Sequence, residues 1–283
     1  MKKITISLTL FASLMLLLCS PLPAAASRLE EFVLYPFVQH FNWEEFDSQG
    51  VRILEESGPL FGVGTLLRID LHEGLLMLQA KGELFGGNVD YEGQTQFDPD
   101  DPAVSEIPVN TDVDYFGTRI EGDFGLRLGG EAKGSIEPFV GLGYRYWIRD
   151  LNDSVAVDRN GDLVGVGGYT EEWQSLYTRW GMRGAYAFDE DFKLFAEVGG
   201  KYPLYNENRV DYFSENDVTI KPGEQFSSFA EAGFRIDRFR ATVFYEGFKF
   251  KRSPLVHAGG GDFLLQPESK SEIIGISLGY CFQ

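Results

Sequence analysis

The chain has 283 residues, a formal net charge of −18 and only two cysteines. Glycine is frequent, at 33 residues, and aromatic residues make up 14%, a composition that favours an all-β protein. The negative charge argues against nucleic-acid binding. Beyond the amino-terminal segment no run of 18 consecutive apolar residues occurs, which excludes a helical membrane protein.

The first 26 residues have the pattern of a signal peptide. Lys2 and Lys3 precede an apolar run at 4–18, and a small-residue cleavage site follows at 24–26. The run is shorter than the roughly 20 residues that a membrane-spanning helix needs. We therefore expect residues 1–26 to be removed, leaving 27–283 as one exported β domain. Cys281 is then the only cysteine, so no intrachain disulfide is expected.

Alternation of apolar and polar residues predicts about ten strands in the mature chain. In the stretch 113–130, Phe116 and Phe124 fall on one face, whereas Arg119 and Asp123 fall on the other. The other expected strands lie near 31–41, 59–71, 75–86, 136–148, 174–188, 192–204, 226–236, 239–250 and 274–282. Alternation alone does not say which face points inward.

The connections between these strands alternate in length. Short turns are expected at 72–74, 129–134, 189–191 and 237–238, and long polar connections at 42–58, 87–114, 150–172, 206–225 and 251–271. This layout is typical of an up-and-down antiparallel transmembrane β-barrel, whose apolar strand faces meet lipid. A count of twelve strands stays open, because two of the long connections have room for a further hairpin.

The signal peptide, the alternating strands and the ending at 279–283 resemble the small bacterial outer-membrane β-barrel proteins. Members usually end in an aromatic residue, whereas here Phe282 is penultimate and Gln283 follows it. The resemblance implies a Gram-negative outer membrane, contact with its lipid and lipopolysaccharide, and insertion by the barrel-assembly machinery. It also implies extracellular long loops, with short turns and termini in the periplasm. No cofactor is implied.

The charged face of the strands is expected to line a narrow lumen and to pair there, because buried charge is tolerated only when paired. The expected network comprises Lys81, Glu83, Arg119, Glu121, Asp123, Arg127, Glu137, Arg145, Arg179, Arg183, Glu197, Glu231 and Arg235. Further charges on this face are Arg68, Asp70, Lys193, Lys201, Arg240 and Glu246. For the 113–130 strand the expected partners are its neighbours Lys81, Glu137 and Arg145. With Phe139, Trp147, Trp173 and Tyr177, these side chains predict a largely plugged lumen.

Three long connections, 42–58, 87–114 and 150–172, together hold 19 acidic residues and 2 basic ones. We expect them to form a solvated, acidic outer surface. A second interpretation is the binding of divalent cations or of a basic partner. The residues that would bind a cation are Asp98, Asp100 and Asp101, and Asp158, Asn160 and Asp162. The second group is also typical of an Asn-Gly turn.

Signals for catalysis are weak. The three histidines are His40, His72 and His257, and none has a serine two residues further on, as the barrel lipid A deacylases have. His257 with Asp262 is similar to part of the Asp-His couple of the omptin proteases, but no Asp-x-His sequence occurs. We therefore predict a structural or surface-interaction barrel that is not an enzyme. The alternatives are a narrow cation-preferring channel and an omptin-like surface hydrolase.

Overall fold

The computed structural model describes residues 28–95, 103–130, 134–211, 217–259 and 262–282, so the expected signal peptide lies outside the described residues. The elements are β1 (Arg28–Phe46), β2 (Arg52–His72), β3 (Leu76–Gln94), β4 (Pro108–Leu126), β5 (Leu128–Gly130), β6 (Gly134–Leu151), β7 (Ser154–Val157), β8 (Leu163–Val166), β9 (Thr170–Ala187), β10 (Phe192–Asp211), β11 (Val218–Ile220), β12 (Gly223–Glu224), β13 (Ser227–Ile236), β14 (Phe239–Lys251), β15 (Val256–Gly259), β16 (Asp262–Leu264) and β17 (Glu268–Phe282). No helix in this part of the chain is long and apolar enough to cross a lipid bilayer.

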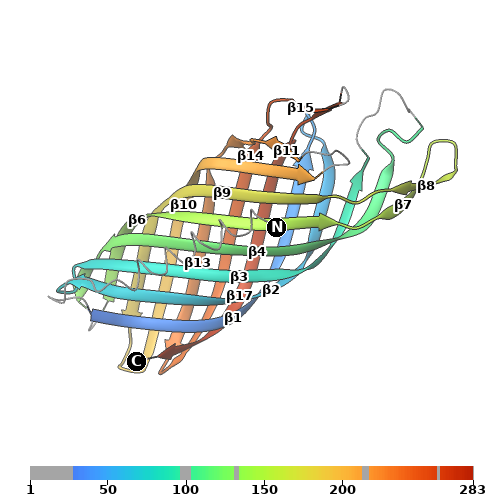
Figure 1. Ribbon diagram of the computed structural model, residues 1–283. Helices are drawn as coiled ribbons and strands as arrows, with labels where there is room; N and C mark the ends of the chain where they lie inside the picture. The colour runs from blue at the N-terminus through green and yellow to red at the C-terminus, as the bar shows by residue number, and fades with distance from the viewer. Residues whose placement is uncertain (1–27, 96–102, 131–133, 212–216, 260–261, 283) are drawn as a thin grey trace.

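Ten long strands form a closed antiparallel barrel (Figure 1). Their order is β1-β2-β3-β4-β6-β9-β10-β13-β14-β17, and β17 pairs back onto β1 from Phe32↔Phe282 to Phe46↔Glu268. Closure pairs the two edge strands of the barrel sheet with each other, as a sheet in lipid requires. The prediction of ten strands is therefore confirmed. The additional hairpins β7–β8 and β15–β16 are separate two-stranded sheets in the long connections.

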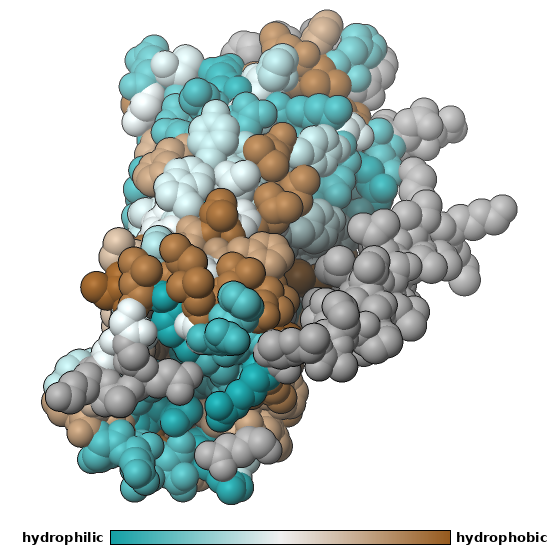
Figure 2. Space-filling view, turned by 90° about the vertical axis from the view of Figure 1, so that its left-hand side faces the viewer, coloured by the Kyte–Doolittle hydropathy of each residue, from teal (hydrophilic) through white to brown (hydrophobic). Residues whose placement is uncertain are grey.

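An apolar band surrounds the outside of the barrel. Its side chains point outward and stay exposed, among them Val63, Phe116, Val140, Val198 and Ile276, each between 57% and 60% exposed. Figure 2 shows apolar side chains gathered across the middle of one face, with hydrophilic residues above and below them. Because a soluble protein rarely exposes so continuous an apolar surface, the band is the part of the barrel that faces lipid.

The strands continue well beyond the apolar band at one end, and this corrects the predicted long connections. β1 runs to Phe46 and β2 starts at Arg52, so the range 42–58 is mostly paired strand around a tight turn. Similarly, β3 runs to Gln94 and β4 starts at Pro108, which leaves 95–107 between them. We call the strand segments beyond the band, such as 40–46 of β1 and 108–115 of β4, the upper barrel, and the rest the lower barrel.

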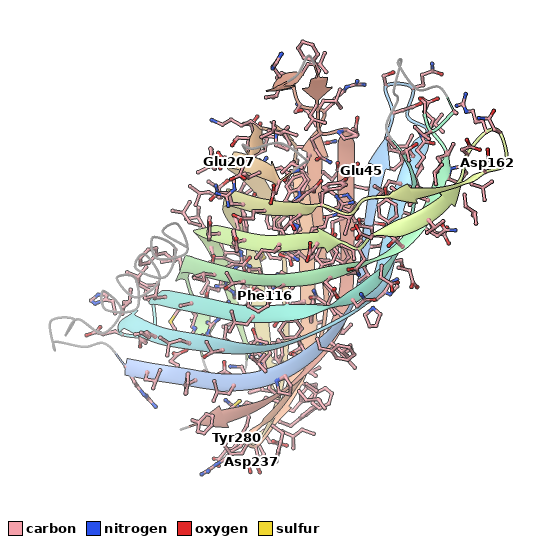
Figure 3. All side chains as sticks on the ribbon, turned by 45° about the vertical axis from the view of Figure 1, so that its right-hand side comes forward. Glu45, Phe116, Asp162, Glu207, Asp237 and Tyr280 are labelled. Atoms are coloured by element: carbon pink, nitrogen blue, oxygen red, sulfur yellow. The ribbon has the colours of Figure 1, made fainter. Side chains whose placement is uncertain are left out.

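The polarity of the two strand faces inverts between these two parts. In the lower part of β4, Phe124 points outward and Asp123 is buried inside, whereas in the upper part Asp114 points outward and Val113 is buried inside. Figure 3 shows the two ends, with Asp237 and Tyr280 at the short-turn end and Glu45, Glu207 and Asp162 at the other. The upper strands were mistaken for loops because their apolar side chains face inward rather than outward.

Candidate functional site

The lumen of the lower barrel is crossed by a network of ion pairs centred on Glu246 of β14. Its carboxylate binds Lys201 Nζ at 2.6 Å and Arg145 Nη1 at 3.2 Å, and it also pairs with Arg119. Arg119 pairs in addition with Glu83 of β3. The four groups that contact Glu246 or bridge to it therefore come from β3, β4, β6 and β10, on different sides of the lumen. All five side chains are buried.

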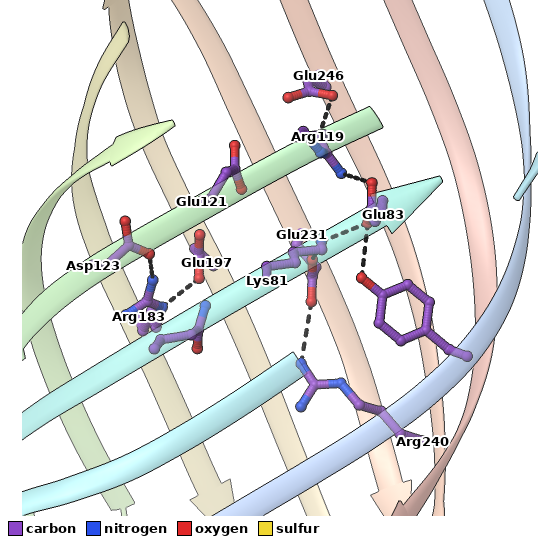
Figure 4. Close-up of polar contacts among 12 residues, drawn as sticks. Lys81, Glu83, Arg119, Glu121, Asp123, Arg183, Glu197, Glu231, Arg240 and Glu246 are labelled. Carbon is purple, nitrogen blue, oxygen red and sulfur yellow. Dashed lines mark hydrogen bonds and ion pairs between the residues drawn. The ribbon is translucent and has the colours of Figure 1, made fainter. Parts of the chain in front are cut away.

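A second centre of the network surrounds Asp123 of β4 (Figure 4). Arg179 Nη1 lies 2.8 Å from Asp123 Oδ2, and Arg183 pairs with the same carboxylate. Glu197 joins both guanidinium groups from β10, at 2.6 Å from Arg179 Nη2. Glu121 accepts a hydrogen bond from the Tyr177 hydroxyl at 2.8 Å and pairs with Arg179 at 3.0 Å. No charge in this centre lacks an opposite charge beside it.

The rest of the network reaches towards the short-turn end. Lys81 Nζ contacts Glu231 at 3.0 Å and Glu83 at 3.4 Å, and Arg240 bridges Glu231 and Glu31. Further pairs join Glu137 to Arg183, Arg68 and Arg127, and Arg127 to Glu30.

The structure places the thirteen residues of the expected network on the inner face, and twelve of them form ion pairs. Arg235 is the exception, since it has no carboxylate within 4.0 Å among the described residues. Of the four charges on the 113–130 strand, Glu121 and Asp123 pair with Arg179 of β9 and not with a neighbouring strand, so the prediction is wrong for them. Arg127 contacts the expected Glu137, and Arg119 pairs with Glu83 of the adjacent β3, which was not among its expected partners. Lys81 lies next to Glu121 in the β3–β4 register but binds Glu231 across the lumen. Long side chains in a narrow barrel reach the opposite wall as easily as the next strand.

The upper barrel is filled by an aromatic plug instead, defined by Trp43 of β1, Trp147 of β6, Trp173 of β9 and Phe250 of β14. Trp147 and Trp173 stack with ring centroids 5.3 Å apart, and Trp173 contacts both Trp43 and Phe250 at 5.2 and 5.3 Å. All four rings are buried. Because β1 lies on the opposite wall from β6 and β9, these contacts bridge the full width of the lumen.

Buried acids line the plug, and sequence reasoning had placed them on the outer surface. Arg149 pairs with Glu56 and, at 2.9 Å, with Glu171. The indole N–H groups of Trp43 and Trp173 donate hydrogen bonds to Glu45 at 2.9 Å and Glu171 at 2.7 Å. The alternation of the strands could have identified these acids, because each falls on the same strand face as apolar residues that point into the barrel.

Glu45 is the acid of this group whose negative charge has, in the described part of the chain, no basic side chain beside it. Gln266 Nε2 donates a hydrogen bond to it at 2.8 Å, and no basic group lies within 4.0 Å of it among the described residues. Burial raises the pKa of the Glu45 carboxyl to about 7; Arg149 opposes this rise, and the nearby Glu171 adds to it. Glu45 lies beyond the apolar band, in the upper barrel. It therefore exchanges a proton near neutral pH.

The lower and the upper barrel also differ in their cavities. A cavity of about 100 Å³ lies in the lower barrel, lined by members of the charge network and by none of the four plug rings. A second cavity, of about 10 Å³, is bounded by Trp43, Trp147 and Phe248, and is large enough for about one water molecule. The larger cavity thus ends below the plug.

The expected cation site is described only in part. Asp98, Asp100 and Asp101 lie outside the described residues. Asp158 Oδ1 accepts hydrogen bonds from the backbone N–H groups of Asn160 and Asp162, and Gly161 has φ of +91°. These bonds lower the pKa of Asp158 and close the β7–β8 turn, as an Asn-Gly turn does. In the described part of the chain, no cluster of three or more His, Cys, Asp or Glu residues is arranged to hold a metal ion.

The histidines lie apart from one another. His72 ends β2 at a short turn, and His257 on β15 packs its ring against Phe263 with centroids 5.2 Å apart. The side chain of Asp262, the expected partner of His257, lies outside the described residues. His40 Nε2 lies 3.3 Å from Ser57 Oγ on the outer face of β1 and β2. No short sequence motif indicates this contact, because the two residues meet only through the pairing of β1 with β2.

No protein-family model and no curated protein sequence matches the chain. Among solved structures, the outer-membrane protease OmpT from Escherichia coli superposes with a TM-score of 0.56 at 12% identity, over 92% of this chain and 99% of OmpT. The translocator domain of the autotransporter NalP from Neisseria meningitidis is similar at a TM-score of 0.36 and 13% identity, over 98% of this chain and 96% of that domain. At these identities the likeness concerns the fold alone. The chain thus has the fold of the small outer-membrane β-barrel proteins.

Proposed function

We propose that the protein is a closed, non-conducting barrel of a bacterial outer membrane, with a structural or surface-interaction role at its long-loop end. The observation that carries the proposal is the double closure of the lumen. Trp43, Trp147, Trp173 and Phe250 bridge the upper barrel, and the ion pairs of Glu246 and Asp123 cross the lower one. A water-filled path would have to break both sets of contacts.

The proposed orientation puts the upper barrel outside the cell. The outward faces of β1 to β6 carry acidic residues just beyond the apolar band: Glu44, Glu55, Asp90, Glu92, Asp112, Asp114 and Asp150. An acidic surface carried by paired strands suits contact with a basic partner. The short turns at the other end offer little surface for such contact.

Osmotic swelling of proteoliposomes tests the closure. We expect vesicles that contain the refolded barrel to swell in small sugars no faster than empty vesicles. Rapid swelling would favour the alternative of a narrow channel, for which the acids around Arg149 would set a preference for cations.

Labelling of whole cells tests the orientation. A single cysteine introduced in place of Asn160, in a Cys281→Ser background, should react with a membrane-impermeant maleimide in intact cells. A cysteine in place of Glu190, at a short turn, should react only after the outer membrane is broken. The reverse pattern would contradict the proposed orientation.

A further inference from the structure

The contact between His40 and Ser57 joins a nucleophile to a base on the outer wall of the barrel. Ser57 Oγ lies 3.3 Å from His40 Nε2, within the reach at which an imidazole can accept a hydroxyl proton. In the β1–β2 register His40 faces Pro59 and Ser57 faces Asn42, so the two residues are diagonal neighbours on one face. His40 is exposed and Ser57 is partly exposed, so a substrate can reach both.

The position of this pair along the barrel wall determines which part of a lipid molecule lies beside it. Its outward neighbours level with His40 and towards the short turns are apolar, with Ile274 57% and Phe61 60% exposed. Towards the upper barrel they are polar, namely Asn42 beside Ser57 and Glu272 across from Asn42. The pair thus lies at the edge of the apolar band. In a lipid leaflet this is the depth at which the acyl chains join the head group through ester bonds.

We propose that Ser57 and His40 form an esterase site that hydrolyses acyl esters of membrane glycerophospholipids. Ser57 Oγ attacks the ester carbonyl carbon while His40 Nε2 takes its proton. The bond from that carbon to the glycerol oxygen then breaks, and His40 returns the proton to the leaving oxygen. Water, deprotonated by His40, then attacks the acyl carbon. The bond from that carbon to Ser57 Oγ breaks, His40 returns the proton to Ser57 Oγ, and the fatty acid leaves. The products are one lysolipid and one fatty acid for each water consumed.

The charges beside the pair select the head group. Asp90 of β3 lies directly across from Ser57, and Glu272 of β17 lies across from Asn42, two residues along β1 from His40. Neither carboxylate is paired with a basic side chain in the described part of the chain, whereas Glu44 and Glu55 are both paired with Arg52. An ammonium group would be attracted to Asp90 and Glu272, and a purely anionic head group would be repelled. The substrate class is therefore a phospholipid with an amine head group.

Barrel refolded from inclusion bodies, which is free of host membrane enzymes, tests the proposal. The probes are a fluorophosphonate and vesicles of phosphatidylethanolamine or phosphatidylglycerol. We expect the fluorophosphonate to label Ser57, and Ser57→Ala to lose labelling and reduce fatty-acid release by at least about 100-fold. His40→Gln should reduce both by a similar factor. The matched control is Ser228→Ala, because Ser228 is also exposed and outward-facing but lies on β13, three strands from β1.

Each outcome bears on a separate part of the proposal. Labelling and hydrolysis that survive in Ser57→Ala, or that are absent from the wild-type barrel, would overturn the esterase site. Equal hydrolysis of the two lipids would overturn the selection by Asp90 and Glu272. Heat-modifiable migration on gels shows that each variant is folded, so loss of activity cannot be ascribed to loss of the barrel.

Discussion

The upper and lower barrel are built from the same strands with opposite polarity. On β4, Val113 and Tyr115 face inward above the point at which Arg119 and Asp123 face inward below it. On β4 the alternation of side chains does not shift by a residue; only the chemistry on each face changes. The comparison teaches that the surroundings of a strand, lipid below and water above, decide which face is apolar.

The two halves are consequently closed by different forces. The lower barrel has opposite charges held together in a space shielded from water, where an unpaired charge is costly. The upper barrel has aromatic rings whose burial stabilises it without charge, together with Glu45, Glu56 and Glu171 around the single guanidinium of Arg149. Substitutions in the two halves should therefore have different signatures.

The largest effect is expected from Glu246→Gln, which leaves Arg119, Arg145 and Lys201 without their shared carboxylate. We expect a loss of about 3–5 kcal/mol in the free energy of unfolding, as for other broken buried ion pairs. Urea unfolding of the barrel in lipid vesicles measures it. Glu92→Gln, which removes an exposed charge from the outer face of the upper barrel, is the control. Equal effects of the two variants would contradict the network.

Trp173→Ala removes the ring with the shortest contacts to the other members of the plug, all at 5.2 to 5.3 Å between centroids. The expected loss is about 3 kcal/mol, at the lower end for a buried tryptophan. The matched variant is Trp180→Ala, since Trp180 is 41% exposed on the outer face of the same strand. A smaller loss for Trp173→Ala than for Trp180→Ala would show that the plug does not stabilise the upper barrel.

Glu45 should make stability depend on pH. Its folded pKa of about 7 lies above the ordinary value of 4.5, so the folded state keeps a proton that the unfolded state has lost. Stability that is fully present below pH 4.5 is therefore lost as pH rises through 7, by about 1–3 kcal/mol. Glu45→Gln should remove this loss. The check is the difference between the unfolding free energies of wild type and variant from pH 4.5 to 8, and a difference that does not change with pH would contradict the assignment.

The smallest effect is expected at the exposed turn of the β7–β8 hairpin. Asp158→Ala removes the acceptor for the N–H groups of Asn160 and Asp162 and should leave global unfolding unchanged. Limited proteolysis should instead cut faster between Val157 and Leu163. Arg159→Ala in the same turn is the control, and identical cleavage of both variants would mean that the Asp158 bonds do not hold the turn.

Sequence reasoning succeeded where the lower barrel follows a simple rule. The 113–130 strand was oriented correctly, because apolar residues such as Phe116 and Phe124 face lipid and the charges face the lumen. It failed where the polarity inverts: the acids of 42–58 were assigned to a loop, although Glu45 and Glu56 point into the barrel.

Contacts between distant strands were beyond the reach of the sequence. Lys81 and Glu231 are separated by 150 residues, and nothing in the spacing of either strand says which charges meet across the lumen. His40 and Ser57 are closer in sequence, but their contact depends on the register of β1 and β2, which a loop at 42–58 would not have fixed. The residue types were therefore predictable and their partners were not.

The conductance of the purified barrel in a planar lipid bilayer tests the closed lumen most directly. We predict no steady openings for the wild-type protein in salt solution at either polarity. The double variant Trp43→Ala/Trp173→Ala should still not conduct, because the ion pairs of Glu246 and Asp123 continue to cross the lower barrel. Steady, sizeable openings of the wild-type barrel would contradict the closure on which the proposed function depends.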